Sequence, residues 1–311
     1  MKCLVTGATG FVGRHLSEAL AVTGHEVFGL ARASGSHDGA VKFPLYAVDL
    51  LDASAVNLTL HEVRPDWLFH LAGYANAGRS FREPEAAWSG NLHATQSLYT
   101  AIERSGLRPR ILFVSSGLVY GDAEPGSPAF DELAPLQPAS PYAASKAAAD
   151  LLSYQQARSP GLDIVRVRPF NQIGPNQSAE YAAANFVRQI VAIERGKQES
   201  KLVTGDLSAE RDLTDVRDMV QAYIHLLEVG KSGDVFNAGS GRTYVMRDVL
   251  NKLIAMCRVK VDVEERPDTS RAKDTAVTRA DTTKLRKQTG WVPMHSLEQS
   301  LGDMLADVRS R

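Results

Sequence analysis

The feature that most constrains the fold is a glycine-rich turn directly after the first apolar segment. Leu4-Val5 begins a predicted strand, and Gly7, Gly10 and Gly13 follow at the spacing G-x-x-G-x-x-G, where a helical pattern opens. Glycine lets the backbone approach a pyrophosphate, and a helix N-terminus offers free N–H groups to an anion. A purely structural turn also favours glycine, but the position after the first strand of a strand–helix–strand pattern favours a dinucleotide site. The residues predicted to form this site are Gly7, Thr9, Gly10, Phe11, Val12 and Gly13.

Short apolar runs alternate with helical patterns through the first half of the chain. Helical segments of about ten to fifteen residues separate predicted strands near 4–5, 27–28, 45–48, 67–71, 111–114 and 164–167. With right-handed crossovers, this pattern predicts an α/β fold, a Rossmann-like doubly wound parallel sheet. Beyond residue 170, a smaller C-terminal α/β lobe is indicated by helical patterns near 181–196, 215–229, 244–256 and 296–309. We therefore expect a dinucleotide-binding domain over 1–170 and a second lobe over 171–311, and the chain can cross back between them.

Composition and charge exclude several classes of protein. The 35 Lys and Arg residues nearly balance 36 Asp and Glu residues, whereas proteins that bind nucleic acid or anionic membranes carry a basic surplus. No apolar run approaches the length of a membrane span, and the N-terminus lacks the pattern of a signal peptide. Cys3 and Cys257 are too few for a disulfide framework or a cysteine-based metal site. We expect a cytoplasmic protein without metal, nucleic-acid or membrane partners.

The end of the second predicted strand distinguishes between the two nicotinamide cofactors. NAD-dependent enzymes of this architecture place an acidic residue there, and it hydrogen-bonds the ribose hydroxyls. In this chain Arg32 follows Leu30-Ala31 instead. A guanidinium binds a 2′-phosphate bidentately, whereas a carboxylate repels it. The alternative is that Arg32 is an ordinary solvated side chain, but the pattern favours NADP(H) over NAD(H).

The stretch from Ser140 to Lys146 carries the clearest chemical signal. Ser140 is a favourable N-cap, so Tyr142 and Lys146 lie one turn apart on one face of the helix that it begins. A nearby ammonium and the helix N-terminus favour the phenolate, and the pair then serves as general acid and base for a carbonyl/alcohol couple. At the end of the fifth predicted strand, Ser115 and Ser116 are candidates for a hydroxyl that hydrogen-bonds the reacting oxygen.

Together these motifs resemble the extended short-chain dehydrogenase/reductase family, of the NAD-dependent epimerase/dehydratase type. The resemblance covers essentially the whole chain and is carried by the glycine-rich turn, Asp49-Leu50, His70 to Gly73, Asn91, Ser115 to Gly121, Tyr142 with Lys146, Arg168 to Asn171 and Gly290-Trp291. It implies Ser116 as the catalytic hydroxyl, Tyr142 as acid/base, and Lys146 as both pKa modulator and ribose ligand. It implies further cofactor contacts from Asp49, Leu50, Leu71, Ala72 and Gly73. His70 is interpreted as structural.

Within this family the chain is most similar to the branch that reduces GDP-4-keto-6-deoxy-mannose. The segments that carry the similarity are Arg168 to Ser178, Phe186 to Glu194 and Arg211 to Asp218. The resemblance implies that the second lobe binds the nucleotide sugar, with contacts from Ser116, Asn171, Arg211 and Arg271. Two arginines from separate segments match the charge of a diphosphate. Arg188 is a further candidate, with a solvated helix residue as the equal alternative.

The two residues that directly follow the catalytic hydroxyl narrow the range of possible reactions. Dehydratases of this family carry an acidic residue there, whereas Gly117 and Leu118 occupy those positions in this chain. We therefore predict NADPH-dependent reduction of the 4-keto group, which forms GDP-rhamnose. One alternative is an NAD-dependent nucleotide-sugar epimerase, which Arg32 disfavours. Another is a regulatory subunit that only binds the dinucleotide, which the complete set of catalytic residues disfavours.

Two predicted helices, near 85–104 and 141–157, bear on assembly. The second is rich in alanine, and small residues allow helices to approach closely; these residues are Ala143, Ala144, Ala147, Ala148 and Ala149. The family resemblance implies a homodimer with a four-helix interface. The alternative is an alanine-rich helix buried within one chain.

Overall fold

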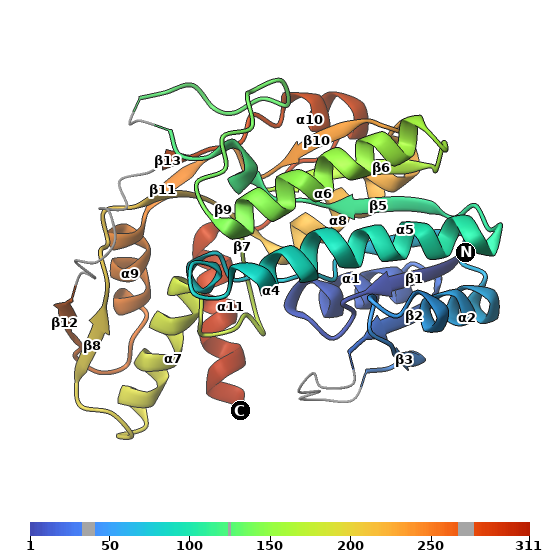
Figure 1. Cartoon of the computed structure of the whole chain (residues 1–311). Helices are drawn as coiled ribbons and strands as arrows, with labels where there is room; N and C mark the ends of the chain where they lie inside the picture. The colour runs from blue at the N-terminus through green and yellow to red at the C-terminus, as the bar shows by residue number, and fades with distance from the viewer. Residues whose placement is uncertain (33–40, 124–125, 267–276) are drawn as a thin grey trace.

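The centre of the molecule is a seven-stranded, wholly parallel sheet with the strand order β10-β6-β5-β4-β1-β2-β3 (Figure 1). The structure is a computed structural model, and it describes residues 1–32, 41–123, 126–266 and 277–311. The strands are β1 (Lys2–Thr6), β2 (Glu26–Ala31), β3 (Leu45–Ala47), β4 (Trp67–His70), β5 (Arg110–Val114), β6 (Ile164–Pro169) and β10 (Val235–Ala238). The central strands are buried and mostly apolar, as expected for a parallel sheet covered on both faces, but β6 also carries the buried Arg166 and Arg168. The predicted Rossmann-like fold is confirmed.

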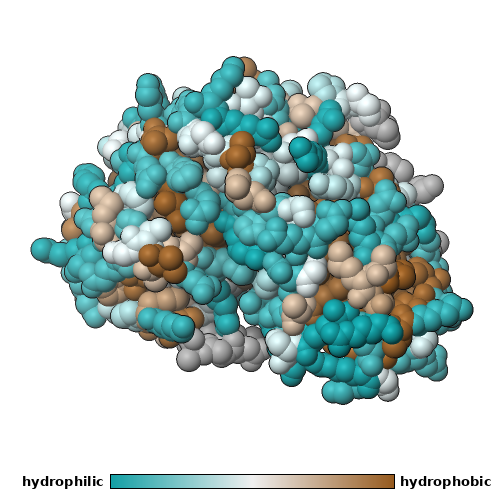
Figure 2. Space-filling model, turned by 180° about the vertical axis from the view of Figure 1, so that it is seen from behind, coloured by the Kyte–Doolittle hydropathy of each residue, from teal (hydrophilic) through white to brown (hydrophobic). Residues whose placement is uncertain are grey.

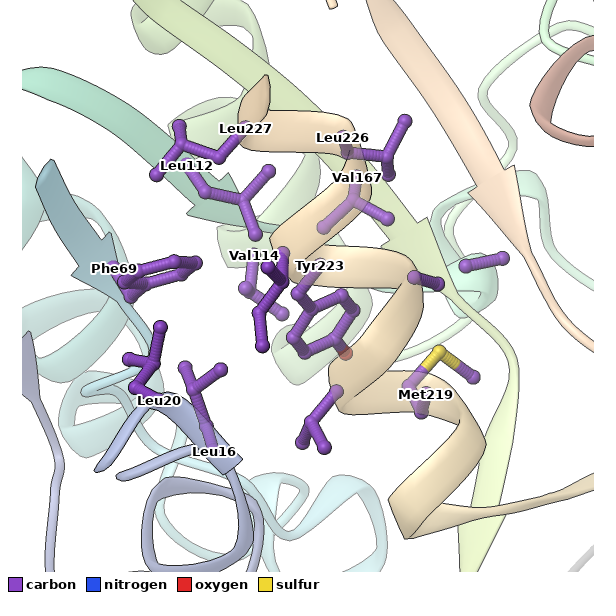
Figure 3. Close-up of a cluster of buried hydrophobic side chains, with 14 of the residues drawn as sticks. Leu16, Leu20, Phe69, Leu112, Val114, Val167, Met219, Tyr223, Leu226 and Leu227 are labelled. Atoms are coloured by element: carbon purple, nitrogen blue, oxygen red, sulfur yellow. The ribbon is translucent and has the colours of Figure 1, made fainter. Parts of the chain in front are cut away.

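Helices cover both faces of this sheet. On one face lie α1 (Phe11–Val22), α8 (Val216–Val229) and α10 (Thr283–Thr289). On the other lie α2 (Ala53–Val63), α5 (Ala94–Ser105) and α6 (Pro141–Arg158). Figure 3 shows the core under α1 and α8, where side chains of the two helices meet those of β4, β5 and β6. Each fully buried side chain of this kind contributes about 1.5–3 kcal/mol, so the sheet holds the site at its carboxyl edge firmly.

The chain returns to the main sheet after its first excursion into the smaller lobe. β10 pairs with β6 at the sheet edge, and α8 packs against α1 and β5. Residues beyond 170 therefore supply one strand and two helices of the dinucleotide-type domain. We propose that no single residue separates the two lobes, because the chain crosses back to the main sheet after residue 215.

The smaller lobe lies beside the carboxyl edge of the main sheet (Figure 1). One small sheet has β9 (Glu210–Asp215) between β11 (Thr243–Val245) and β13 (Val277–Thr278), with β7 (Asn171–Ile173) also paired to β9. A second pairs β8 (Lys201–Thr204) with β12 (Asp262–Glu265). The helices of this lobe are α7 (Ala182–Glu194), α9 (Met246–Ala255) and α11 (Leu297–Ser310), and they share one apolar core.

The helix expected near 85–104 is interrupted. After α3 (Ala77–Ser80), the chain forms α4 (Pro84–Trp88), a π-helical turn over Ser89–His93 and then α5. Such turns are uncommon and often lie at functional sites. Here the turn buries Asn91, whose Nδ2 donates to Ser145 Oγ of α6 at 2.9 Å. The interruption therefore ties α5 to the helix that carries Tyr142 and Lys146.

The face opposite the view of Figure 1 is mostly hydrophilic, with hydrophobic residues in small dispersed groups (Figure 2). Among the helices that the structure describes, none is long and apolar enough to cross a membrane.

Candidate active site

A cavity of about 910 Å³ lies at the carboxyl edge of the main sheet, against the smaller lobe. Residues that follow β1, β4, β5 and β6 line it, together with the start of α6 and the region around α7. Ligands of doubly wound sheets bind outside these strand ends, because consecutive loops diverge there. The cavity is therefore the candidate binding site for both cofactor and substrate.

The glycine-rich turn forms one end of this region and fits a pyrophosphate. Gly7 has φ +72°, and a Cβ there would lie 2.9 Å from Ala72 N, so only glycine fits against the strand-end backbone. A Cβ at Gly13 would overlap the carbonyl oxygen of Gly7. Gly10 precedes α1, and no side chain among the described residues caps that helix. The N–H groups of its first turn are thus available to an anion.

The other predicted cofactor residues lie along the same edge. Phe11, Val12, Leu71 and Gly73 line the cavity, whereas Arg32 is exposed directly after β2. Asp49 is exposed after β3, and Leu50 is buried beside it. Ala72 N donates to Thr6 Oγ1 at 3.1 Å, and Thr9 O accepts from Arg14 Nε at 3.0 Å. These positions suit a dinucleotide that extends from the cavity across β1 toward the ends of β2 and β3.

The three predicted catalytic residues meet in the cavity. Ser116 follows β5, and its hydroxyl faces the hydroxyl of Tyr142 across the cavity that both residues line. Ser140 caps α6 by accepting from Ala143 N at 3.1 Å, which starts the helix that presents Tyr142 and Lys146. Lys146 Nζ donates to the carbonyl of Val114 at 2.8 Å. Ser115 also lines the cavity, and its hydroxyl has no hydrogen-bond partner among the described residues.

Burial dominates the electrostatics of this trio. It raises the pKa of Tyr142, and the hydrogen bond from Ser116 partly opposes that rise. It lowers the pKa of Lys146 to about 8, against the opposing charge of Asp150. The arrangement therefore places a protonated phenol, a hydroxyl and an ammonium that is readily neutralised around one point. This set can hold a carbonyl oxygen and give it a proton.

His70 is structural, and its tautomer follows from counting protons. Thr95 Oγ1 donates its proton to the carbonyl of Asn91 at 2.5 Å, so it accepts from His70 Nε2 at 2.9 Å. His70 Nδ1 therefore accepts from Thr6 Oγ1, at 2.8 Å. Burial and the positive charge of nearby Lys146 lower the pKa of His70 to about 3. A neutral imidazole thus joins β1, the end of β4 and the start of α5.

The predicted substrate residues are only partly brought together. Asn171 and Arg211 line the cavity, from β7 and β9. Arg188 is exposed on α7 and is not among the lining residues. Arg271 lies outside the described residues. The structure thus places one of the two predicted diphosphate arginines in the cavity.

Sequence reasoning missed a group of residues at the mouth of the cavity. Arg79 NH1 donates to Glu180 Oε1 at 3.2 Å, and Tyr181 donates its hydroxyl proton to the carbonyl of Ala75 at 3.1 Å. These contacts join the segment around α3 to the segment before α7, and Tyr74 lines the cavity beside them. Loop residues of this kind follow no periodic pattern. The one available signal was an aromatic side chain directly after the strand-end motif at 70–73.

The fold, the glycine-rich turn and the Ser/Tyr/Lys set define a dinucleotide-dependent enzyme of the extended short-chain dehydrogenase/reductase class. The sequence model of the GDP-mannose 4,6-dehydratase family matches residues 4–304, and the chain belongs to this family. The chain is therefore an NAD(P)-dependent oxidoreductase that acts on a hydroxyl or keto group.

Individual relatives cover the chain from end to end. It is 34% identical to GDP-6-deoxy-D-mannose reductase of Pseudomonas aeruginosa, over 100% of this chain and 98% of the relative. A structure of RMD from Pseudomonas aeruginosa complexed with NADPH superposes with a TM-score of 0.87 and 31% identity, over 99% of both chains. UDP-glucose 4-epimerase of Thermus thermophilus in complex with NAD superposes with a TM-score of 0.89 and 29% identity, also over 99% of both.

Proposed function

We propose that this enzyme uses NADPH to reduce the 4-keto group of GDP-4-keto-6-deoxy-mannose, or a close analogue, and forms GDP-rhamnose. The observation that carries the proposal is the packing of Gly117. A Cβ at this position would lie 2.8 Å from the ring of Phe170, so a carboxylate cannot stand next to Ser116 without displacing that ring. The similarity to GDP-6-deoxy-D-mannose reductase supports the same reaction.

Each residue of the site would have a separate role in the reduction of a carbonyl group. NADPH, when bound, supplies the hydride for the sugar carbon. Ser116 would hydrogen-bond the carbonyl oxygen, and Tyr142 would give that oxygen its proton as negative charge develops. Lys146 would stabilise the resulting tyrosinate by its positive charge and would also bind the cofactor ribose. Because the site is buried, these electrostatic contributions are larger than they would be in water.

The remaining predicted contacts position the two ligands. Asn171 would bind the sugar, and Arg211 and Arg271 would bind the diphosphate from separate segments. On the cofactor, the turn at 7–13 would hold the pyrophosphate, and Asp49 with Leu50 would contact the adenine region.

We also propose a preference for NADPH. Arg32 lies directly after β2 with its side chain exposed, where a guanidinium can reach a 2′-phosphate. The NADPH complex of the Pseudomonas aeruginosa protein supports this proposal. The NAD complex of the Thermus thermophilus epimerase supports the second candidate function, a nucleotide-sugar epimerase that retains its cofactor.

One reconstitution experiment separates these functions. Incubation of the enzyme with GDP-mannose and NADPH alone should oxidise no cofactor, because Gly117 and Leu118 supply no dehydratase acid after Ser116. Adding a GDP-mannose dehydratase should start NADPH oxidation, one equivalent for each keto sugar consumed, and NMR of the product should show GDP-rhamnose. If the keto sugar persists while another nucleotide sugar is epimerised without net cofactor oxidation, the enzyme is an epimerase. If GDP-mannose alone yields the keto sugar, the chain has its own dehydratase acid.

A further inference from the structure

The buried face of α6 carries one carboxylate among three cations. Asp150 is fully buried, one helical turn beyond Lys146. Arg166 NH1 donates to Asp150 Oδ1 at 2.5 Å, and Arg168 Nε donates to Asp150 Oδ2 at 2.7 Å. Both arginines come from β6, and both are buried as well. The cluster therefore places a net positive charge directly behind the predicted catalytic lysine.

We infer that Asp150 is a positioning residue for the reaction, because its carboxylate, held between Arg166 and Arg168, keeps the buried Lys146 in the ammonium form. This inference rests on the roles proposed above for Tyr142 and Lys146. Asp150 itself touches neither ligand site and is not among the residues that line the cavity. It would act on the proton transfer only through the charge of Lys146.

The groups around Lys146 offer little other support for its charge. Its ammonium donates to the carbonyl of Val114 and lies 5.5 Å from the ring centroid of Phe113. From β4, His70 faces it in the neutral form, and from its own helix Tyr142 faces it as a neutral phenol. Burial lowers the pKa of Lys146 to about 8, and the charge of Asp150 is what opposes that fall.

The other groups around Asp150 and Arg166 are neutral. From α5, Tyr99 approaches the cluster, and its hydroxyl shares a hydrogen bond of 2.7 Å with Ser153 Oγ. Arg166 donates further to the carbonyl of Gly233 and lies 4.9 Å from the ring centroid of Tyr154.

The far side of the cluster is held by polar contacts. Arg168 NH1 donates to the hydroxyl of Tyr120 at 2.8 Å, and that hydroxyl donates to Asn237 Oδ1 at 2.7 Å. The carboxylate of Glu132 lies beyond them and accepts from the backbone N–H of Asn237 at 2.8 Å. Asp150 is thus the carboxylate that hydrogen-bonds both arginines directly.

Two substitutions on opposite sides of this charge balance test the inference. Asp150→Asn removes the negative charge and keeps the shape, so the pH above which turnover declines should fall by about one unit or more. Arg166→Met removes one positive charge and leaves Asp150 paired with Arg168, so that pH should rise. A one-unit downward shift would cost up to about tenfold in kcat at a pH above the new limit. Full pH profiles of kcat for both variants and the wild type measure this.

Opposite shifts distinguish an electrostatic role from a structural one. Damage to the packing would lower activity at every pH and would not move the two profiles apart. Profiles that stay in place, or that move in the same direction, would overturn the inference. If Asp150→Asn does not fold, as judged by its Tm, the Arg166→Met profile decides alone: an upward shift supports the inference and an unchanged profile refutes it.

A third variant keeps this test separate from the proposed function. Tyr142→Phe should lower kcat on the same substrate by at least about 10²-fold. If its kcat stays close to that of the wild type, the proposed acid is wrong, whatever the other profiles show. If its kcat falls as expected while the Asp150 and Arg166 profiles do not move, only the role of Asp150 fails.

Discussion

Replacing His70 by glutamine should change how stability depends on pH. In the fold, His70 is 1% exposed and hydrogen-bonded to Thr6 and Thr95. Burial and the positive charge of Lys146 lower its pKa from 6.5 to about 3. The unfolded chain takes up a proton on this residue near pH 6.5, but the folded protein does not until the pH approaches 3. Neutral His70 therefore stabilises the fold fully above pH 6.5, and this stabilisation is lost as the pH falls toward 3.

The size of the effect follows from the distance between the two pKa values. Each unit of difference corresponds to about 1.4 kcal/mol. At pH 5 the unfolded chain is largely protonated at this position and the fold is not, so the wild type has lost about 2 kcal/mol. His70→Gln lacks this loss. At pH 7.5 the variant should be less stable by about 1–3 kcal/mol, because two buried threonine hydroxyls lose well-placed partners.

Urea unfolding of both proteins at pH 7.5 and at pH 5 measures this directly. On acidification, the unfolding free energy of the wild type should fall by about 2 kcal/mol more than that of His70→Gln. His61→Gln is the matched control, because His61 is exposed on α2 and lies outside this network. A difference that stays constant between the two pH values would mean that the fold protonates His70 as readily as the unfolded chain does, and the assignment of a neutral imidazole would be wrong.

Further expectations concern the cofactor, the acid and the assembly. Tyr142→Phe should lower kcat by about 10²–10⁴-fold, since only the proton donor is lost, while NADPH binding measured by fluorescence stays near that of the wild type. Arg32→Ala should reduce the ratio of kcat/KM for NADPH over NADH, and a wild type that prefers NADH would contradict the role of Arg32. Gly13→Ala should abolish dinucleotide binding, measured by titration with NADPH, because the new Cβ would overlap the carbonyl oxygen of Gly7. Gly24→Ala is the control for a glycine substitution in itself, since Gly24 is a left-handed position away from other atoms. Light scattering at micromolar concentration should show a homodimer, and a monomer would refute that expectation.

The parts of the fold that could be predicted from the sequence are those with local signals. β1, α1 and the turn between them combine an apolar run, a helical pattern and glycines over residues 2–22. Tyr142 and Lys146 are likewise neighbours on one helix, and Ser140 marks where it starts. Their meeting with Ser116 could also be anticipated, since the ends of parallel strands share one edge of the sheet.

What could not be predicted depends on contacts between distant segments. Val235-Phe236 is a short apolar run like several others, and only its pairing with β6 makes it an edge strand of the main sheet. The π-helical turn has no repeating pattern, and it is fixed by the contact between Asn91 and Ser145. Asp150 gave one local signal, a charged residue on the buried face of an alanine-rich helix. Its meaning required knowing that two arginines of β6 point at it.

Similarity of fold does not distinguish between a reductase and an epimerase, so the distinction has to come from the chemistry of the site. TM-scores of 0.87 to an NADPH complex and 0.89 to an epimerase with NAD are equivalent for this purpose. An epimerase returns the hydride to the sugar and has no need to exchange its cofactor, whereas a reductase consumes one cofactor in every turnover. In the proposed function, the exposed Arg32 would offer the exchanging cofactor a phosphate contact, and Gly117 leaves no space for a dehydratase acid at its own position beside Ser116. Both features favour an enzyme that receives a finished keto sugar and only reduces it.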